Sequence, residues 1–346
     1  MPHAAPRAHS LLCSVALLCP GACAAAPAAV GLQTEVVFSE HSPLSGSAEV
    51  VRRLLSPLAA VEVARTLERS GEGLAAQSID LAAERFILYV PARAPPRGYG
   101  LLVFIPPWDA AQLPRGWEPV LERAGVIFVS AARSGNDADV LGRREPLALI
   151  AAYNVMQRYQ VDGTRVYVGG FSGGSRIALR VALAYPDLFH GALLNAGSDP
   201  LDAGPPSPPA RELLQRFQES TRIVYVTGEH DDLHLAMDSD SLRSMREWCV
   251  FDTEADVTRG AGHEPAGPAA LARALSELDR HTAANPTRLA ACREALDKRV
   301  AGQLARAQAL IDSGKRAEAR QLLLEVDRRF GGLAAPQSVA LDKALD

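Results

Sequence analysis

The chain has 346 residues, a length that allows one large domain together with shorter appendages. Hydrophobic residues make up 48% of the sequence and charged residues 22%, which is the balance of an ordinary globular protein. The formal net charge of −4 excludes a global electrostatic attraction to nucleic acid or to an anionic membrane.

The N-terminus, residues 1–24, has the pattern of a secretory signal peptide. Arg7 precedes an apolar run at 11–18 that is too short to span a bilayer, and small residues follow it. We therefore expect cleavage near Ala24 and a secreted or periplasmic protein. The alternative is a lipoprotein anchor on Cys23. Without such a lipid, no later segment is apolar enough for stable insertion into a membrane.

Cleavage of this segment leaves two cysteines, Cys249 and Cys292. An even number of cysteines in an oxidising compartment favours a disulfide between them, and two separately buried thiols are the alternative. Their spacing does not suit a zinc site, and no cluster of histidine and cysteine accompanies them.

From residue 76 to residue 284, apolar runs typical of strands alternate with helical segments. We expect strands at 84–90, 101–105, 126–131, 165–171, 192–195, 223–227 and 254–257, and helices at 116–124, 146–159, 177–184, 239–248 and 266–281. This alternation predicts an α/β fold with a doubly wound, mostly parallel sheet and helices on both faces. The proline-rich loop at 197–221 is short, so we expect no large lid domain and an open site.

Two helical regions flank this domain. Residues 25–75 include a stretch of helical composition at 48–69, which we expect to lie against the main domain. Residues 285–346 carry apolar residues at helical spacing, and 309–330 (ALIDSGKRAEARQLLLEVDRRF) is similar to one tetratricopeptide-type hairpin. A single hairpin cannot bury its own core, so a docked helical extension that stabilises the fold is favoured over a partner-binding repeat.

The motif Gly170-x-Ser172-x-Gly174 stands between a strand pattern and a helix pattern. A serine at the apex of such a turn is typical of a nucleophile elbow, where small neighbours are needed beside strained backbone. The elbow exposes the Ser172 hydroxyl and directs the amide of Gly173 at the group that the serine attacks. The alternative is a serine in an ordinary glycine turn.

The segment 161–192, VDGTRVYVGGFSGGSRIALRVALAYPDLFHGA, resembles the elbow region of α/β-hydrolases. Within that superfamily it is similar to secreted esterases related to polyhydroxyalkanoate depolymerases. The resemblance covers residues 79–281. It implies an α/β-hydrolase fold and hydrolysis of a carboxylic ester, small or polymeric, and it does not define the substrate.

In α/β-hydrolases the acid follows the serine in the chain and the histidine follows the acid. The resembling enzymes carry the acid in a G-x-x-D motif after a buried strand, which corresponds here to Asp231. Asp232 and Glu229 are neighbouring carboxylates that could replace it. The alternative for the whole segment is a charged surface turn.

His263 is the expected base, because it follows a glycine-rich turn after the last strand and precedes a helix. The other histidines fit less well because they lie too close to the elbow helix, beside the acid, or at a helix end: His190, His230, His234 and His281.

An oxyanion hole needs two N–H donors. Gly173 supplies one, and the second is expected from the loop after the strand at 101–105. Pro106 and Pro107 have no N–H, so Trp108 is the first available donor, although the resembling enzymes more often have a His-Gly pair there. The Trp108 ring is expected either to line the substrate pocket or to pack in the core. The polar loop 133–137 should open at the edge of the same site.

No phosphate-binding loop, dinucleotide fingerprint or metal-ligand cluster occurs in the sequence, so we expect no cofactor and no metal. The sequence therefore predicts a serine hydrolase that cleaves carboxylic esters. A serine peptidase or an acyltransferase with the same triad is an alternative. So is a non-catalytic binding protein that works through its C-terminal helices.

Overall fold

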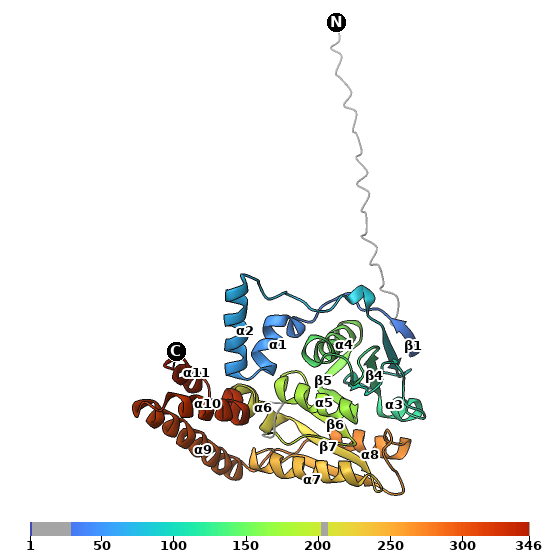
Figure 1. The fold of residues 1–346 in the computed structure, drawn as a ribbon. Coiled ribbons are helices and arrows are strands. Elements are labelled where there is room, and N and C mark those ends of the chain that lie inside the picture. The colour runs from blue at the N-terminus through green and yellow to red at the C-terminus, as the bar shows by residue number, and fades with distance from the viewer. Residues whose placement is uncertain (2–28, 202–206, 346) are drawn as a thin grey trace.

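The computed structural model describes residues 29–201 and 207–345 together with Met1, and the predicted signal peptide lies outside these residues. Their centre is an eight-stranded sheet with the order β1-β2-β4-β3-β5-β6-β7-β8 (Figure 1). Strand β2 is antiparallel to β1 and β4, and the other pairs are parallel. The strands are β1 (Gly31–Val36), β2 (Phe86–Val90), β3 (Tyr99–Ile105), β4 (Val126–Ala131), β5 (Val161–Phe171), β6 (Gly191–Asn195), β7 (Arg222–Gly228) and β8 (Thr253–Thr258).

The helices of the described residues cover both faces and one side of the sheet. They are α1 (Ser47–Leu54), α2 (Pro57–Ser70), α3 (Glu118–Ala124), α4 (Glu145–Arg158), α5 (Gly173–Ala184), α6 (Arg211–Ser220), α7 (Asp232–Glu247), α8 (Pro268–Leu278), α9 (Pro286–Asp312), α10 (Arg316–Phe330) and α11 (Gln337–Lys343). The mostly parallel sheet with helices on both faces confirms the predicted fold class. None of these helices is long and apolar enough to cross a membrane.

Several elements differ from the sequence prediction, among them α7, which begins at Asp232 rather than near residue 239, and α11, which was not predicted. The stretch at 48–69 forms two helices, because Ser56 caps a new helix that begins at Pro57. Helix α6 lies in the loop expected at 197–221. Strand β1 was not predicted, since it is a short, largely exposed strand at the edge of the sheet.

The sheet separates two hydrophobic cores. In β3, Leu101, Val103 and Ile105 face the core shared with α1, α4, α5, α6 and the C-terminal helices. The alternate residues Leu102 and Phe104 face the second core, which α3 and α8 cover. A central strand is thus apolar on both faces, which is why it reads as a continuous hydrophobic run rather than an alternating one.

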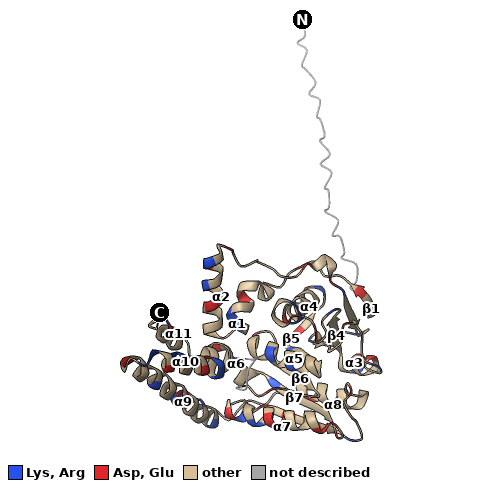
Figure 2. Cartoon of the chain, viewed as in Figure 1, with Lys and Arg blue, Asp and Glu red and all other residues tan. Residues whose placement is uncertain are grey.

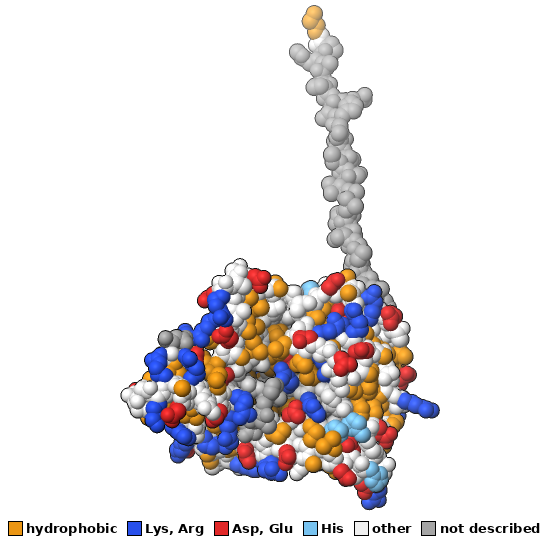
Figure 3. Space-filling view, in the orientation of Figure 1, with side chains coloured by type: hydrophobic (Ala, Val, Ile, Leu, Met, Phe, Trp, Pro, Cys, Tyr) orange, Lys and Arg blue, Asp and Glu red, His pale blue; other side chains and the backbone are white. Residues whose placement is uncertain are grey.

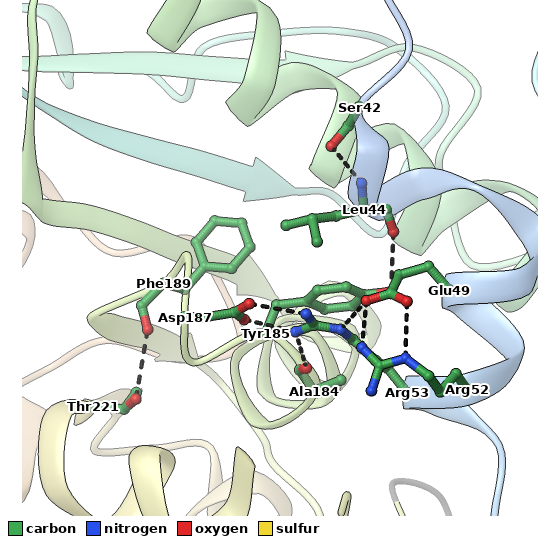
Figure 4. A network of polar contacts seen from close by, with 10 residues as sticks. All are labelled: Ser42, Leu44, Glu49, Arg52, Arg53, Ala184, Tyr185, Asp187, Phe189 and Thr221. Carbon is green, nitrogen blue, oxygen red and sulfur yellow. Dashed lines mark hydrogen bonds and ion pairs between the residues drawn. The ribbon is translucent and has the colours of Figure 1, made fainter. Parts of the chain in front are cut away.

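Helix α1 is held on the main domain through Arg53, whose side chain is only 7% exposed (Figure 4). Its guanidinium donates two hydrogen bonds to Asp187, of 2.6 and 2.9 Å, and one of 2.6 Å to Glu49. It also donates to the Ala184 carbonyl and lies 4.8 Å from the centre of the Tyr185 ring. One side chain of α1 therefore fixes the end of α5.

The C-terminal helices α9 to α11 lie beside α2 and α6 (Figure 1). Leu296 and Leu304 of α9 and Leu322 and Leu323 of α10 belong to the first core. The Phe330 ring lies 6.0 Å from that of Trp248. Asp327 on α10 accepts hydrogen bonds from the Ser56 hydroxyl and from the Leu58 amide, so it supports the start of α2. Charged residues of both signs lie along α7, α9 and α10 (Figure 2). The apolar residues of the same helices form stripes that face the core.

A disulfide joins Cys249 to Cys292, as predicted. Cys249 lies two residues after the end of α7 and is fully buried, whereas Cys292 lies in the second turn of α9 and is half-buried. The bond closes a loop of 43 residues and ties the C-terminal helices to the segment that leads into β8.

Replacing Arg53 with alanine should lower the free energy of unfolding by about 2 kcal/mol. Breaking a buried ion pair leaves a carboxylate without its partner, and the exposure of Asp187 and Glu49, near a quarter each, moderates that cost. Urea denaturation measures the change. The control is Arg52→Ala, which removes a half-exposed partner of the same Glu49 and should cost less than about 0.5 kcal/mol. Equal losses for both variants would contradict a docking role for Arg53.

Replacing Cys292 with serine should lower the free energy of unfolding by about 3–4 kcal/mol, because the unfolded chain regains the freedom of a 43-residue loop. Cys292 is the better target, since truncating the fully buried Cys249 would also disturb packing. Thermal unfolding of the non-reduced proteins measures the effect. A wild-type protein that loses no stability on reduction would contradict this prediction.

Candidate active site

Ser172 lies at the sharp turn between β5 and α5, with φ 53° and ψ −122°. Such a conformation is strained for a residue with a side chain and persists only where the surroundings impose it. A Cβ at Gly170 would collide with the backbone of Gly174, and a Cβ at Gly174 would collide with the carbonyl of Ile105 in β3. The two outer glycines are therefore required by the close approach of three backbone segments.

The structure brings Ser172, His263 and Asp231 into one hydrogen-bonded chain. The Ser172 Oγ lies 3.0 Å from Nε2 of His263, and Nδ1 of His263 lies 2.6 Å from Oδ2 of Asp231. Asp231 is 7% exposed, whereas the neighbouring Asp232 is exposed and the carboxylate of Glu229 accepts the amide of Gly260. Of the three carboxylates considered from the sequence, only Asp231 contacts the imidazole of His263 in the described structure.

Asp231 also accepts a hydrogen bond from a second imidazole, that of His234. Nδ1 of His234 lies 2.7 Å from Oδ1 of Asp231, and the rings of His234 and His263 are stacked with centroids 4.1 Å apart. Burial acts to raise the pKa of Asp231, but the hydrogen bonds from His234 and His263 outweigh it and hold this pKa below its usual range. The sequence places His234 beside the acid and indicates no role for it. Because the helix predicted from the sequence begins only near residue 239, the spacing of three residues between Asp231 and His234 gave no signal, and the contact depends on the earlier start of α7 at Asp232.

The other histidines lie elsewhere. His190 and His281 line a separate cavity of about 450 Å³, and His281 contacts Asp252. His230 is exposed next to Asp231. Histidine side chains reach the visible surface in the region of α7 and α8 (Figure 3), and acidic and basic side chains are interspersed over the same face.

Asn195, at the end of β6, connects three parts of the site and was not identified from the sequence. Its carbonyl accepts the amide of Ser172 at 2.8 Å, and its Oδ1 accepts the amide of Ala266 at 2.7 Å. Its Nδ2 donates to the Val226 carbonyl in β7 at 2.8 Å. A buried amide at the end of an apolar strand was the only sequence signal. Through these bonds Asn195 holds the elbow and the loop that carries His263 in one arrangement.

The two loops expected at the edge of the site are bonded to each other. The amide of Asn136 donates to the Pro107 carbonyl at 3.1 Å, and the Asn136 side chain lies so close to Gly173 that a Cβ there would collide with it. Arg144, which is 3% exposed, donates to the carbonyls of Pro106 at 2.9 Å and Ser134 at 3.0 Å. Burial lowers the pKa of Arg144 to about 10. A buried guanidinium therefore fixes both loops next to the start of α5.

Trp108 lies on the first of these loops and is half-buried. Its ring centroid is 6.1 Å from that of Phe171, the residue before Ser172, and the Phe171 ring lies 4.8 Å from that of His263. Trp108 also lines a cavity of about 440 Å³ whose other walls include Leu113, Trp117 and the segment from Glu264 to Gly267. The ring thus both packs on Phe171 and borders a cavity whose wall includes Glu264, the residue after His263.

Asp231, His234 and His263 offer atoms within 4.8 Å of one another, a spacing that a metal ion could use. However, each imidazole directs Nδ1 at its own oxygen of Asp231, and the rings are nearly parallel at 14°. Stacked rings direct their nitrogens side by side rather than toward one point. The cluster therefore fits a doubly hydrogen-bonded carboxylate better than a metal centre.

No family model matches the sequence, and a search of curated proteins finds no match. Solved structures with a similar chain path include a ferulic acid esterase, with 15% identity, a TM-score of 0.45, and 57% of this chain and 92% of that chain covered. S-formylglutathione hydrolase from Staphylococcus aureus has 12% identity, a TM-score of 0.45, and coverage of 56% and 92%. Dipeptidyl peptidase 4 from Porphyromonas gingivalis has 15% identity and a TM-score of 0.42, with 57% of this chain covered and only 34% of that longer chain.

At these values none of the likenesses assigns an activity to this chain. Its own geometry defines the fold: a mostly parallel sheet, helices on both faces, and a strained serine turn between the central strand β5 and helix α5. The chain has an α/β-hydrolase fold with a helical C-terminal extension.

Replacing Asn195 with alanine should lower the free energy of unfolding by about 2 kcal/mol, because the buried amide of Ala266 loses its acceptor and the carbonyl of Val226 keeps only the amide of Ala196. It should also slow the reaction of Ser172 with a fluorophosphonate probe, since the loop of His263 loses its attachment to β6. Urea denaturation and the rate of labelling measure the two effects.

The matched control is Asn154→Ala. Asn154 is a buried asparagine of α4 that donates to the carbonyls of Glu40 and Ile150, away from the site. This variant should be destabilised to a similar extent and keep the wild-type labelling rate. Equal labelling rates for the Asn154 and Asn195 variants would contradict a role of Asn195 in placing His263.

Proposed function

We propose that this protein is a serine hydrolase that cleaves carboxylic esters through an acyl-enzyme. The hydrogen-bonded chain Ser172–His263–Asp231 at a strained strand-to-helix turn carries the proposal. A serine hydroxyl is a weak nucleophile, and a neighbouring imidazole held by a buried carboxylate is the arrangement that activates it.

In this mechanism the Oγ of Ser172 attacks the carbonyl carbon of the ester, and Nε2 of His263 takes the hydroxyl proton. Asp231 holds the imidazole through Nδ1 and stabilises its charged form. The tetrahedral intermediate collapses when His263 returns the proton to the leaving alcohol. Water, activated by the same imidazole, then releases the carboxylic acid and frees Ser172.

The developing negative charge on the carbonyl oxygen needs donors close to Ser172. The amide of Gly173 belongs to the first turn of α5, where N–H groups have no partner within the helix and the helix dipole favours a negative charge. The backbone amide of Trp108 is the second proposed donor. The Asn136 side chain, in contact with Gly173, is available as a further polar contact to the substrate.

The cavity of about 440 Å³ whose wall includes Glu264, the residue after His263, is the proposed place for one arm of the substrate. Its volume is within the range of small-molecule sites. Its tryptophan, leucine and proline residues offer apolar contacts to an acyl or alcohol group, and Gln112, Arg115 and Glu264 offer polar contacts. Secretion or periplasmic location remains part of the proposal, and the Cys249–Cys292 disulfide is consistent with an oxidising compartment. A serine peptidase or an acyltransferase would use the same three residues and differ from an esterase only in the leaving group or the acceptor.

The proposal predicts labelling of Ser172 by a fluorophosphonate probe and turnover of a short p-nitrophenyl ester. Ser172→Ala should abolish labelling, and Ser172→Ala and His263→Ala should each lower kcat by about 10⁴–10⁶-fold, because the residues act as a unit. The double variant should be little slower than either single variant. Mass spectrometry of the labelled peptide and steady-state kinetics test these outcomes. Absence of labelling in the folded wild-type protein would support a non-catalytic binding protein instead.

The acid is tested by a neighbouring pair of substitutions. Asp231→Asn should reduce kcat strongly, although less than Ser172→Ala, because the neutral amide keeps only one acceptor oxygen and cannot stabilise the charged imidazole of His263. Asp232→Asn changes an exposed carboxylate at the start of α7 and should leave kcat within about two-fold of wild type. A crippling Asp232→Asn together with a mild Asp231→Asn would transfer the role to Asp232.

A further inference from the structure

Asp231 binds two imidazoles with its two oxygens, whereas the proposed mechanism uses only one of them. Oδ2 contacts His263 at 2.6 Å and Oδ1 contacts His234 at 2.7 Å. Because an ionised carboxylate can only accept hydrogen bonds, Nδ1 of each ring carries the hydrogen. In neutral His263 this tautomer leaves Nε2 as the free base opposite the Ser172 hydroxyl. Both oxygens of Asp231 thus accept a hydrogen bond, and the two bonds together fix the plane of the carboxylate.

The position of His234 is built into the fold. Asp231 is the N-cap residue of α7, and His234 is the third residue of that helix, where a side chain can reach back to the cap. Asp231 makes no side-chain capping bond to an amide of α7. Its carboxylate is directed to the imidazoles instead, although amide capping is the common use of an aspartate at this position.

The surroundings also make room for the His234 ring. A Cβ at Gly197, after the end of β6, would lie 2.5 Å from Cδ2 of His234, so the glycine leaves the space that the ring occupies. The side chain of His234 is 12% exposed. Its ring is stacked on that of His263 at 4.1 Å and an interplanar angle of 14°. A second aromatic ring, that of Phe171, lies 4.8 Å from the ring of His263.

We propose that His234 is a positioning residue: its hydrogen bond to Oδ1 fixes the carboxylate of Asp231 so that Oδ2 stays in line with His263, and its ring supports the imidazole. This inference rests on the proposed hydrolase function. A carboxylate held by one imidazole alone can rotate about its Cβ–Cγ bond and can turn to the free amides at the start of α7. His234 prevents both, and it does so without contact to the substrate.

The test compares three substitutions of His234 by kcat and KM on a p-nitrophenyl ester. His234→Ala should lower kcat about 10- to 100-fold and leave KM within about two-fold, because orientation of the base is lost while substrate binding is not. His234→Asn places an amide donor close to the position of Nδ1 and should recover kcat to within about three-fold of wild type. His234→Phe keeps a stacked ring without a donor and should resemble His234→Ala.

The matched control is His281→Ala. It removes another contact of this type, between Nδ1 of His281 and the buried Asp252, 2.7 Å apart and outside the active site. This variant should keep the wild-type kcat. Loss of kcat in His281→Ala equal to that in His234→Ala would assign the effect to general destabilisation and overturn the inference.

A double-mutant cycle tests whether His234 acts through Asp231. In the Asp231→Ala background, His234→Ala should cause no further loss in the rate of fluorophosphonate labelling, since the group that it orients is absent. Losses that multiply would show that His234 acts independently of the acid and would overturn the inference. A wild-type kcat in His234→Ala, or a His234→Phe variant more active than His234→Asn, would also overturn it.

These outcomes separate the inference from the function on which it rests. If wild-type protein neither reacts at Ser172 nor hydrolyses the ester, the proposed function fails and the inference falls with it. If the wild type is active and Asp231→Asn is impaired while His234→Ala is not, the hydrolase function stands and the positioning role of His234 is refuted.

Discussion

The close approach of three backbone segments at the serine turn is the constraint on which the site depends. Strand β5 ends beside the carboxyl end of β3, and α5 begins so near to both that Gly170 and Gly174 have no room for a Cβ. This crowding holds Ser172 in a conformation that an isolated chain would avoid. The same crowding brings the first turn of α5 against the loop after β3. The strain is stabilised by the fully buried strands on either side, which cannot shift without opening both cores.

Around this turn, the loops are held in place by hydrogen bonds from buried polar side chains. Loops cannot form the regular ladders of a sheet, so their positions depend on individual bonds to carbonyl and amide groups. Arg144 joins the loops after β3 and β4, and Asn195 joins the elbow to the loop of His263. Each of these side chains is nearly inaccessible to water, where an unmade hydrogen bond is costly. The site is therefore specified by satisfied polar contacts and not by packing alone.

The terminal segments stabilise the sheet from its sides and take no part in the proposed chemistry. Arg53 attaches α1 to the end of α5, and Asp327 attaches α10 to the start of α2. The disulfide of Cys249 adds a covalent link between α9 and the chain that enters β8. These contacts explain why the C-terminal hairpin, which could not bury its own core, has apolar stripes on α9 and α10: they form part of the first core of the main domain.

The sequence by itself determined the succession of β2 to β8 and of most helices along the chain, the serine turn, and the candidates Asp231 and His263, whereas the order of the strands in the sheet comes from the structure. Each of these leaves a local signal: a continuous apolar run, glycines at fixed spacing, or a polar turn after a strand. It did not determine β1, which is short and largely exposed, or α11, which has only seven residues. Nor did it determine α6, which directly follows a proline-rich stretch that is typical of a loop. Nor did it assign roles to Asn195, Arg144 and His234. Asn195 and Arg144 bond to groups that are far away along the chain, and His234 bonds to a near neighbour through the direction of its side chain. Only the packing of β6, α4 and α7 around the carboxyl ends of the strands brings these partners within bonding distance.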